Sequence, residues 1–203
     1  MDNIFTNNLI YENRFSLPCK LCNIIIKLFE EQTEKQFPGN TFSGVNKNIK
    51  DTTDLLVPKN STKEEDVVWK KIEKTLYSEL YENIKLYINN LTIPNIPYKV
   101  LGSTNMHIDF FMVQKYKKQS GKYIYHNDFC AESNKNRYRV VTFIWYLNTL
   151  EEGGQTEFFG NHLIKPEQGK LLLFPASWTF PHCGKVPISN DKYIITGWFY
   201  TNN

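Results

Sequence analysis

The second half of the chain consists almost entirely of short segments in which apolar and polar residues alternate with a period of two. From residue 98 onward these segments cover 107–116, 138–148, 155–159, 170–174 and 192–200, and they are rich in β-branched and aromatic residues. Gly, Pro and Asn residues separate them, at 153–154, 160–161, 166–169 and 187–190. A period of two places alternate side chains on opposite faces of a strand. The pattern therefore predicts many short strands.

Two segments with helical periodicity precede these strands. Ser16 is a candidate N-cap, Pro18 is tolerated in the first turn, and apolar residues at helical spacing continue to about residue 37. A second helix is expected after the capping-box pair Ser61 and Glu64, and Asn89-Asn90 and Pro94 would end it. Its apolar stripe would be Trp69, Ile72, Leu76, Leu80 and Tyr87. The polar segment 38–60 between the helices is expected to hold a strand or two within a loop.

Two helices followed by evenly spaced strands predict a mainly β fold of the α+β type. In this fold two N-terminal helices buttress a jelly-roll barrel. We expect one domain over 1–203, in which 1–97 provide helical support and a variable loop and 98–203 form the jelly-roll core that carries the site. Hydrophobic residues make up 41% of the 203 residues and aromatic residues 15%, which is enough for a single buried core.

Charge and hydropathy argue against several partners. The net charge is only +3 and is spread evenly, whereas a nucleic-acid interface needs clustered Lys and Arg. No run of about 20 apolar residues is present, and the N-terminus lacks the basic and apolar regions of a secretory signal. We therefore expect no nucleic-acid partner, no membrane span and a cytoplasmic location. The sequence leaves the oligomeric state open.

The four cysteines are expected to be reduced. Cys19 and Cys22 lie one helical turn apart, without the second pair or the preceding strand that a zinc or redox motif would have. Packing in the core is therefore the favoured explanation for this pair.

Two His-x-Asp triplets occur, and only their surroundings distinguish them. The triplet at 107–109 lies within a continuous alternating run, where its histidine and aspartate would share one face as a hydrogen-bonded pair. His126-Asn127-Asp128 follows a glycine-containing segment and precedes a polar loop at 130–138, as ligands at the end of a strand would. The second triplet is the better candidate for a metal site, and the first remains the alternative.

A third metal ligand can come from His162 or His182, because the chain holds only four histidines. His162 lies in an expected turn and is more typical of a surface residue, whereas His182 stands at the end of a strand. Two imidazoles and one carboxylate hold Fe(II) on one face and leave the opposite positions open. Lys192 begins an apolar strand, so an inward-pointing ammonium would need a carboxylate partner, which a dicarboxylate co-substrate would supply.

With these residues in place, the chain resembles the iron- and 2-oxoglutarate-dependent dioxygenases, and specifically their prolyl 4-hydroxylase-like branch. The resemblance covers residues 98–200 closely and residues 10–97 loosely. The matching segments, in order, are Tyr116…Gly121-Lys122-Tyr123…His126-x-Asp128, Arg139-Val140-Val141-Thr142…Tyr146-Leu147-Asn148, Glu152-Gly153-Gly154-Gln155-Thr156-Glu157-Phe158, Pro166…Gly169…Phe174-Pro175 and His182…Gly184-Lys185-Val186-Pro187…Lys192…Trp198. The fold that the resemblance implies is the double-stranded β-helix, which agrees with the jelly roll expected from periodicity.

The resemblance implies three groups of site residues and no catalytic residue beyond the metal ligands. The iron ligands are His126, Asp128 and His182. The residues around 2-oxoglutarate, whose distal carboxylate the lysine would pair with, are Lys192, Tyr116, Thr156 and Tyr146. The residues that match substrate contacts are Arg139, Tyr123 and Trp198.

The implied activity is hydroxylation of an unactivated C–H bond, with 2-oxoglutarate decarboxylated to succinate and CO2. The expected substrate is a prolyl residue in a protein or peptide. Fe(II), 2-oxoglutarate and O2 are the expected cofactors, with ascorbate as an optional addition. The alternatives are hydroxylation of free proline or another small molecule, and a non-enzymatic binding protein with a jelly-roll fold. A nucleic-acid demethylase of the superfamily is disfavoured, because no arginine follows Arg139.

Overall fold

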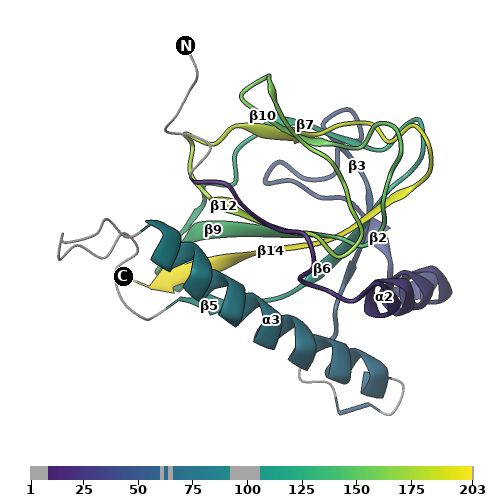
Figure 1. Cartoon of the computed structure of the whole chain (residues 1–203), viewed down its shortest axis with the longest axis horizontal. Helices are drawn as coiled ribbons and strands as arrows, with labels where there is room; N and C mark the ends of the chain where they lie inside the picture. The colour runs from purple at the N-terminus through teal and green to yellow at the C-terminus, as the bar shows by residue number, and fades with distance from the viewer. Residues whose placement is uncertain (1–8, 60–61, 64–65, 92–105, 203) are drawn as a thin grey trace.

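Most of the chain folds into two antiparallel sheets that lie one above the other (Figure 1). The computed structural model describes residues 9–59, 62–63, 66–91 and 106–202. The nine-stranded major sheet has, in order, β1 (Tyr11–Asn13), β12 (Leu171–Pro175), β9 (Arg137–Tyr146), β14 (Lys192–Asn202), β6 (Met112–Tyr116), β4 (Thr53–Leu56) and β2 (Phe37–Pro38), with β5 (His107–Ile108) beside β14 and β8 (Ala131–Glu132) beside β9. The five-stranded minor sheet has, in order, β11 (His162–Ile164), β10 (Thr156–Phe158), β13 (His182–Gly184), β7 (Lys122–His126) and β3 (Lys50–Asp51).

The central strands of the major sheet are apolar on both faces because both faces are buried. On β9, Phe143 and Trp145 belong to the cluster that includes the helices, whereas Ile144 and Tyr146 belong to the cluster between the two sheets. All four side chains are at most 7% exposed. A strand covered on both sides loses the apolar–polar alternation of a half-buried strand. The period of two predicted over 138–148 and 170–174 therefore does not hold for β9 and β12, whose residues are almost all apolar and buried.

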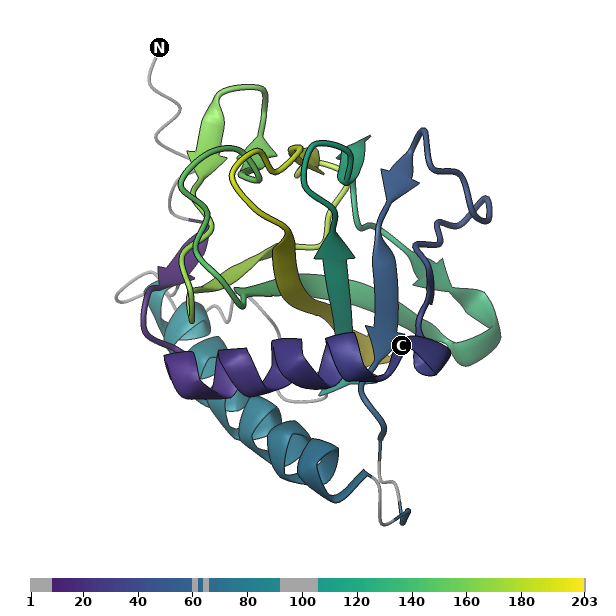
Figure 2. The same ribbon diagram turned by 90° about the vertical axis from the view of Figure 1, so that its right-hand side faces the viewer.

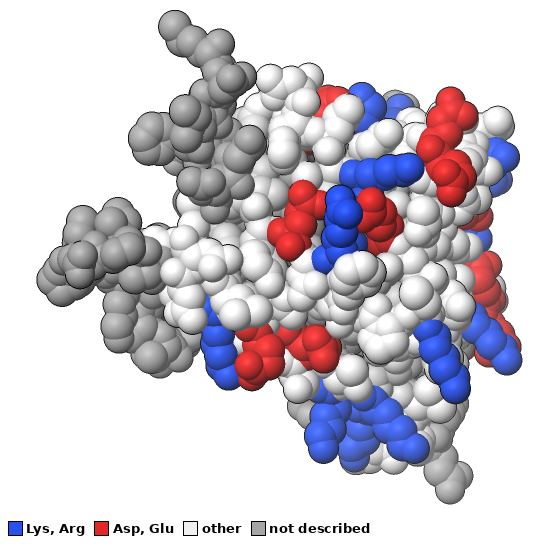
Figure 3. All heavy atoms as spheres, in the orientation of Figure 1, with Lys and Arg blue, Asp and Glu red and all other residues white. Residues whose placement is uncertain are grey.

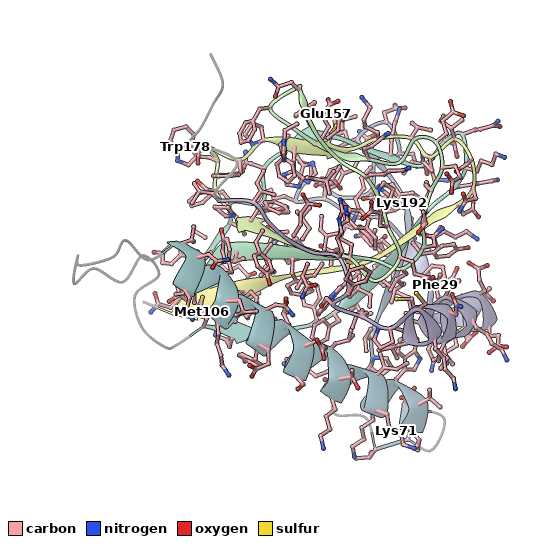
Figure 4. All side chains as sticks on the ribbon, viewed as in Figure 1. Phe29, Lys71, Met106, Glu157, Trp178 and Lys192 are labelled. Atoms are coloured by element: carbon pink, nitrogen blue, oxygen red, sulfur yellow. The ribbon has the colours of Figure 1, made fainter. Side chains whose placement is uncertain are left out.

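Two helices cover the outer face of the major sheet and lie on the same side of it (Figures 1 and 2). The helix α2 (Cys19–Glu31) buries Cys22, Ile25 and Phe29, and Figure 4 shows Phe29 on the side of α2 that faces the sheet. The helix α3 (Val67–Leu91) buries the whole predicted stripe, which is Trp69, Ile72, Leu76, Leu80 and Tyr87. The predicted fold class, a mainly β jelly roll with two flanking helices, is confirmed.

The first helix differs from the prediction at both ends. It begins at Cys19 with Pro18 as its N-cap, and no side chain caps it. Ser16 accepts a hydrogen bond from the buried Trp145 Nε1 at 3.0 Å, so its hydroxyl is used in the core instead of at the helix end. The helix stops at Glu31, and a short 3-10 helix, η1 (Thr33–Lys35), follows it. The predicted cap at Ser61 and Glu64, the stop at Pro94 and the boundary at 97/98 lie outside the described residues.

The strand predicted over 107–116 is interrupted, and the predicted pairing of its histidine and aspartate is wrong. The interruption separates β5 from β6, and both strands pair with β14 at different points along its length. Asp109 accepts a hydrogen bond from Arg137 Nη2 at 2.8 Å, whereas the His107 ring stacks on Tyr200 with 5.8 Å between ring centroids. Asp109 lies just after β5 and pairs with Arg137, so its side chain does not follow the alternating pattern of the predicted strand.

His162 was expected in a turn but begins β11, where it lies opposite Phe158 of β10. The turn comes earlier, at 159–161, and Phe159 and Gly160 in it both have positive φ angles of 54° and 77°. Tight hairpin connections of this kind require left-handed backbone conformations. The turn therefore needs fewer residues than the sequence pattern suggested.

The polar segment 38–60 contains the strands β3 and β4, as the prediction of a strand or two allowed. Only Thr52 separates them, yet β3 pairs with β7 of the minor sheet and β4 pairs with β6 of the major sheet. This segment therefore passes directly from one sheet to the other beside the space between them.

Cys22 is buried and Cys19 is exposed, and neither is in a disulfide. Burial, together with the nearby Cys19, raises the pKa of the Cys22 thiol to about 12, so this thiol stays protonated. The packing explanation therefore fits Cys22.

On the face shown in Figure 3, basic and acidic side chains are interspersed over the strands. A group of basic side chains lies at the lower edge, near the end of α3 where Figure 4 labels Lys71. Neither helix in the described part of the chain is long and apolar enough to cross a membrane.

Candidate active site

The two sheets bring His126, Asp128 and His182 together at one end of the space between them. His126 is the last residue of β7 and His182 the first of β13, and the two are direct cross-strand partners. Asp128 follows two residues after β7. One ligand atom from each residue lies within 4.8 Å of the others, and within the described ranges no other group of three His, Cys, Asp or Glu residues does so. Each histidine Nε2 is 3.7 Å from an oxygen of Asp128.

Backbone carbonyls orient both imidazoles toward this point. His126 Nδ1 lies 2.8 Å from the Ile124 carbonyl oxygen, and His182 Nδ1 lies 3.1 Å from the Phe180 carbonyl oxygen. A carbonyl oxygen can only accept, so each Nδ1 carries the proton and each Nε2 keeps a free lone pair. The hydroxyl of Thr142 on β9 donates to Asp128 Oδ2 at 2.8 Å and fixes the carboxylate in the same way.

The protonation states suit metal binding. Burial and the neighbouring His182 lower the pKa of His126 to about 4, so its imidazole is neutral at pH 7. Burial alone would raise the pKa of Asp128, but His182, His126 and the Thr142 hydroxyl outweigh it and lower the pKa. Two imidazoles and one carboxylate with open positions opposite them form a donor set that suits Fe(II).

Lys192 lies at the start of β14, opposite Tyr116 of β6, and is only 1% exposed. Its Nζ donates to the Gly154 carbonyl oxygen at 2.9 Å and lies 4.0 Å from the centre of the Tyr116 ring. Both neighbours are uncharged. Burial accordingly lowers the pKa of Lys192 to about 7. Figure 4 shows Lys192 at the level between the two sheets. A buried ammonium with neutral neighbours favours the binding of an anion.

Thr156 on β10 lines the same space, and its hydroxyl lies 2.6 Å from the hydroxyl of Tyr146. Tyr146 itself is fully buried and does not line the cavity in the described part of the chain. The four residues expected around a dicarboxylate are therefore neighbours, but Tyr146 reaches the cavity only through Thr156.

Arg139 and Trp198 form a stacked pair on the major sheet. The guanidinium carbon of Arg139 lies 3.6 Å from the centre of the Trp198 ring. Arg139 Nε and Trp198 Nε1 are both buried and have no hydrogen-bond acceptor among the residues that the structure describes. Opposite them, the Tyr123 ring stacks on His126 with 3.5 Å between ring centroids. Buried N–H groups without acceptors are costly, so this arrangement favours a ligand that brings carbonyl or carboxylate oxygens.

A cavity of about 580 Å3 lies between these residues. Its size suits a small ligand or a single residue of a peptide. Of the site residues that the family resemblance implies, all except Tyr146 line the cavity. The sequence-based interpretation missed Lys50 and Gln114, which also line the cavity, and it gave no role to Thr142. Lys50 lies in the segment read as a loop, and Gln114 lies in a strand where one polar residue is unremarkable. Neither carried a signal that could have placed it at the site.

The profile of the 2OG-Fe(II) oxygenase superfamily matches residues 102–200 of this chain. A protein of Acanthamoeba polyphaga mimivirus, provisionally assigned as a prolyl 4-hydroxylase, is 23% identical over 182 residues. The match covers 81% of this chain and 64% of the mimivirus protein, so the chain spans less than two thirds of that relative.

Solved structures of prolyl hydroxylases share the fold. The viral collagen prolyl hydroxylase of Paramecium Bursaria Chlorella virus-1, in its 2OG complex, has a TM-score of 0.66 and 16% identity, with 95% of this chain and 96% of that chain covered. A Pseudomonas putida prolyl-4-hydroxylase has a TM-score of 0.65 and 19% identity, with coverages of 94% and 92%. A Trichoplax adhaerens prolyl hydroxylase, in complex with a hypoxia inducible factor peptide fragment, has a TM-score of 0.69 and 21% identity, with coverages of 95% and 83%.

Proposed function

We propose that the chain, whose residues 102–200 match the profile of the 2OG-Fe(II) oxygenase superfamily, is a dioxygenase that hydroxylates a prolyl residue in a protein or peptide. The superfamily implies Fe(II), 2-oxoglutarate and O2. The observation that carries the proposal is the convergence of His126, Asp128, His182 and Lys192 on one cavity. A sugar-binding or other non-enzymatic jelly roll would have no need of this combination.

In this proposal His126, Asp128 and His182 hold the iron. The carbonyl oxygens of Ile124 and Phe180 fix the two imidazoles with Nε2 toward the metal, so little reorganisation is needed when it binds. When bound, iron supplies the activation of O2 that couples decarboxylation of 2-oxoglutarate to succinate and CO2 with hydroxylation of the substrate. The protein supplies the ligand geometry and excludes water from the cavity.

Lys192 would bind the distal carboxylate of 2-oxoglutarate. Its ammonium is buried, and a carboxylate would replace the neutral contacts that leave it destabilised. The hydroxyl groups of Tyr116 and Thr156 line the same end of the cavity and can donate to the same carboxylate. Ascorbate is proposed as an optional reductant on the family resemblance alone.

The substrate assignment rests on the Arg139–Trp198 pair and on Tyr123. Trp198 and Tyr123 offer aromatic surfaces to a pyrrolidine ring, and the unpaired Arg139 Nε and Trp198 Nε1 can donate to peptide carbonyl oxygens. A peptide offers several such carbonyl groups in a row. Free proline or another small amino acid is the second candidate, because Arg139 could instead bind a free carboxylate.

We extend the proposal to the whole of 1–203 as one domain. The segment before residue 60 contributes β1, β2 and β4 to the major sheet and β3 to the minor sheet. A jelly-roll core without these strands would lose edges of both sheets and the lysine that lines the cavity from β3.

Proline-containing peptides should be hydroxylated, and free proline should not be. The two substrates are to be compared at equal concentration by 2-oxoglutarate consumption and by a mass gain of one oxygen. Arg139→Gln and Trp198→Leu should each lower kcat/KM for the peptide by about tenfold or more, because each removes a donor or an aromatic surface that the substrate would contact. Glu152→Gln, on an exposed turn, is the matched control. Hydroxylation of free proline with every peptide inert would overturn the peptidyl assignment and leave the iron assignment standing.

The affinity for 2-oxoglutarate should fall as the pH rises above about 7. Burial lowers the pKa of Lys192 to about 7 in the ligand-free protein, and a bound carboxylate raises it again. The complex therefore holds more protons than the free protein above pH 7, and linkage weakens binding by up to about tenfold per pH unit there. Below pH 7 this group is already protonated and adds no further change.

Calorimetric titrations of the iron-loaded protein under nitrogen at pH 6 to 9 would measure this slope. Lys192→Arg is the matched variant, because a guanidinium stays protonated throughout this range. The same slope in Lys192→Arg would show that another group causes the pH dependence.

A further inference from the structure

Four side chains form a continuous line of polar contacts at the end of the cavity where Lys192 lies. Lys50 Nζ donates to Asp54 Oδ2 at 2.8 Å, and Gln114 Nε2 donates to the same oxygen at 3.1 Å. The hydroxyl of Tyr116 lies 3.4 Å from Gln114 Oε1. The line starts on β3 of the minor sheet and continues over β4 and β6 of the major sheet. Three of its members, Lys50, Gln114 and Tyr116, line the cavity.

All four side chains are buried, with exposures of 4% for Lys50, 1% for Asp54 and 3% each for Gln114 and Tyr116. A buried ion pair is a poor way to gain stability, because apolar residues of similar size often stabilise a fold as well or better. Buried polar groups of this kind can instead fix one geometry. The question is therefore what this line of contacts fixes.

The donors and acceptors can be ordered in only one direction. An ammonium can only donate, so Asp54 Oδ2 is an acceptor for Lys50 and equally for Gln114. The Gln114 amide must then turn its NH2 group toward Asp54 and its carbonyl oxygen toward Tyr116. Burial raises the pKa of Tyr116 well above its usual value, so the phenol keeps its proton. That single hydrogen is therefore directed at Gln114 Oε1.

The Tyr116 ring itself has little freedom. Lys192 Nζ lies over it at 4.0 Å, and a Cβ atom added to Gly184 on β13 would come within 3.0 Å of Tyr116 Cε1. With the ring fixed, rotation of the O–H bond is the movement that remains. The hydrogen bond from the Tyr116 hydroxyl to Gln114 Oε1 is long, at 3.4 Å, and therefore weak. A carboxylate in the cavity can replace Gln114 as the acceptor.

We propose that Gln114 is a positioning residue that competes with 2-oxoglutarate for the Tyr116 hydroxyl and so lowers the affinity for this co-substrate, with Lys50 and Asp54 holding the amide in the competing orientation. The inference rests on the proposed function, since the ligand is 2-oxoglutarate. When the hydroxyl turns to the ligand, the buried Gln114 carbonyl loses its donor. An unpaired buried acceptor costs free energy, and this cost lowers the affinity for 2-oxoglutarate.

Gln114→Met should therefore bind 2-oxoglutarate about two- to fivefold more tightly than the wild type, which is the lower part of the range for one buried hydrogen bond because the 3.4 Å contact is long. In a Tyr116→Phe background there is no hydroxyl to compete for, so Gln114→Met should leave the affinity unchanged. The difference between the two backgrounds is the coupling that a double-mutant cycle isolates. A residue with only a structural role would weaken binding or have the same effect in both backgrounds.

The affinities are to be measured by calorimetry on iron-loaded protein under nitrogen, with iron content and thermal midpoint recorded for each variant. Gln168→Met is the matched control, because this partly exposed amide hydrogen-bonds Asn23 and the Leu147 carbonyl. Gln114→Leu replaces Gln114→Met if the latter does not fold.

Tighter binding in the Gln114 variant, confined to the background that has the hydroxyl, supports the proposal. Weaker or unchanged binding overturns it and leaves the proposed function intact. A wild-type protein that binds no 2-oxoglutarate overturns both. The three results are therefore distinguishable.

Discussion

His182→Ala should abolish Fe(II) binding, and 2-oxoglutarate turnover should be lost with it. His182 would supply one of three iron ligands, and its Nε2 lies 3.7 Å from Asp128 and belongs to a buried side chain. Loss even of residues that only orient metal ligands costs about 10- to 100-fold in affinity, so loss of a ligand should cost more. Iron content after anaerobic loading and desalting measures the first effect, and succinate formation measures the second. His126→Ala should behave in the same way.

The other two histidines provide matched controls. His107 stacks on Tyr200, and His162 begins the edge strand β11. His107→Ala and His162→Ala should therefore keep full iron stoichiometry. If His107→Ala lost its iron while its fold was preserved, the triplet at 107–109 would be the metal site and the assignment to His126 and Asp128 would fail.

Lys192→Ala should raise the concentration of 2-oxoglutarate needed for half-maximal turnover by about 30-fold or more, while iron stays bound. Removing one partner of a buried charge-assisted pair typically costs at least 2 kcal/mol, which corresponds to about this factor. Lys192→Arg should be affected less, because it keeps the charge, although its planar fork must fit beside Tyr116. Turnover measured over a range of 2-oxoglutarate concentrations gives the shift directly.

Lys185→Ala is the control for Lys192→Ala. Lys185 lies on the surface next to β13 and pairs with Glu157 at 2.8 Å. It should leave the 2-oxoglutarate requirement unchanged. An unchanged requirement in Lys192→Ala would instead show that another group binds the distal carboxylate.

Much of the fold could be predicted from sequence because single elements carry their own periodicity. The stripe on α3 was predicted residue by residue, from Trp69 to Tyr87, since helical spacing depends only on neighbours along the chain. The start of α2 could not be predicted, because the hydroxyl of Ser16 accepts a hydrogen bond from Trp145, which is 129 positions away, and does not cap the helix. The interruption of the strand at Asp109 has the same kind of cause, an ion pair with Arg137 that no local pattern shows.

The residues of the candidate site also fall into two groups, those that a local motif identifies and those whose position depends on the tertiary fold. His126, Asp128, His182 and Lys192 could be named because they belong to ordered motifs, and the structure brings them to one cavity. Lys50 could not, because its place there depends on the pairing of β3 with β7, which joins residues 50 and 123. A pairing between strands so far apart in sequence is set by the tertiary fold and leaves no trace in the residues around position 50.

In the part of the chain that the structure describes, the helices cover only one of the two sheets, so mutations on the helices and mutations on the minor sheet can act independently. The outer face of the minor sheet carries partly exposed side chains such as Ile124, Tyr125 and Leu163, whereas α2 and α3 bury their apolar stripes against the major sheet. Effects of substitutions at distant sites without shared partners usually add. A variant chain could therefore acquire stabilising changes on the helices and an altered substrate preference at Tyr123 on β7 in either order. Such a protein is a convenient starting point for laboratory evolution, since a higher free energy of unfolding need not come at the expense of a new substrate preference.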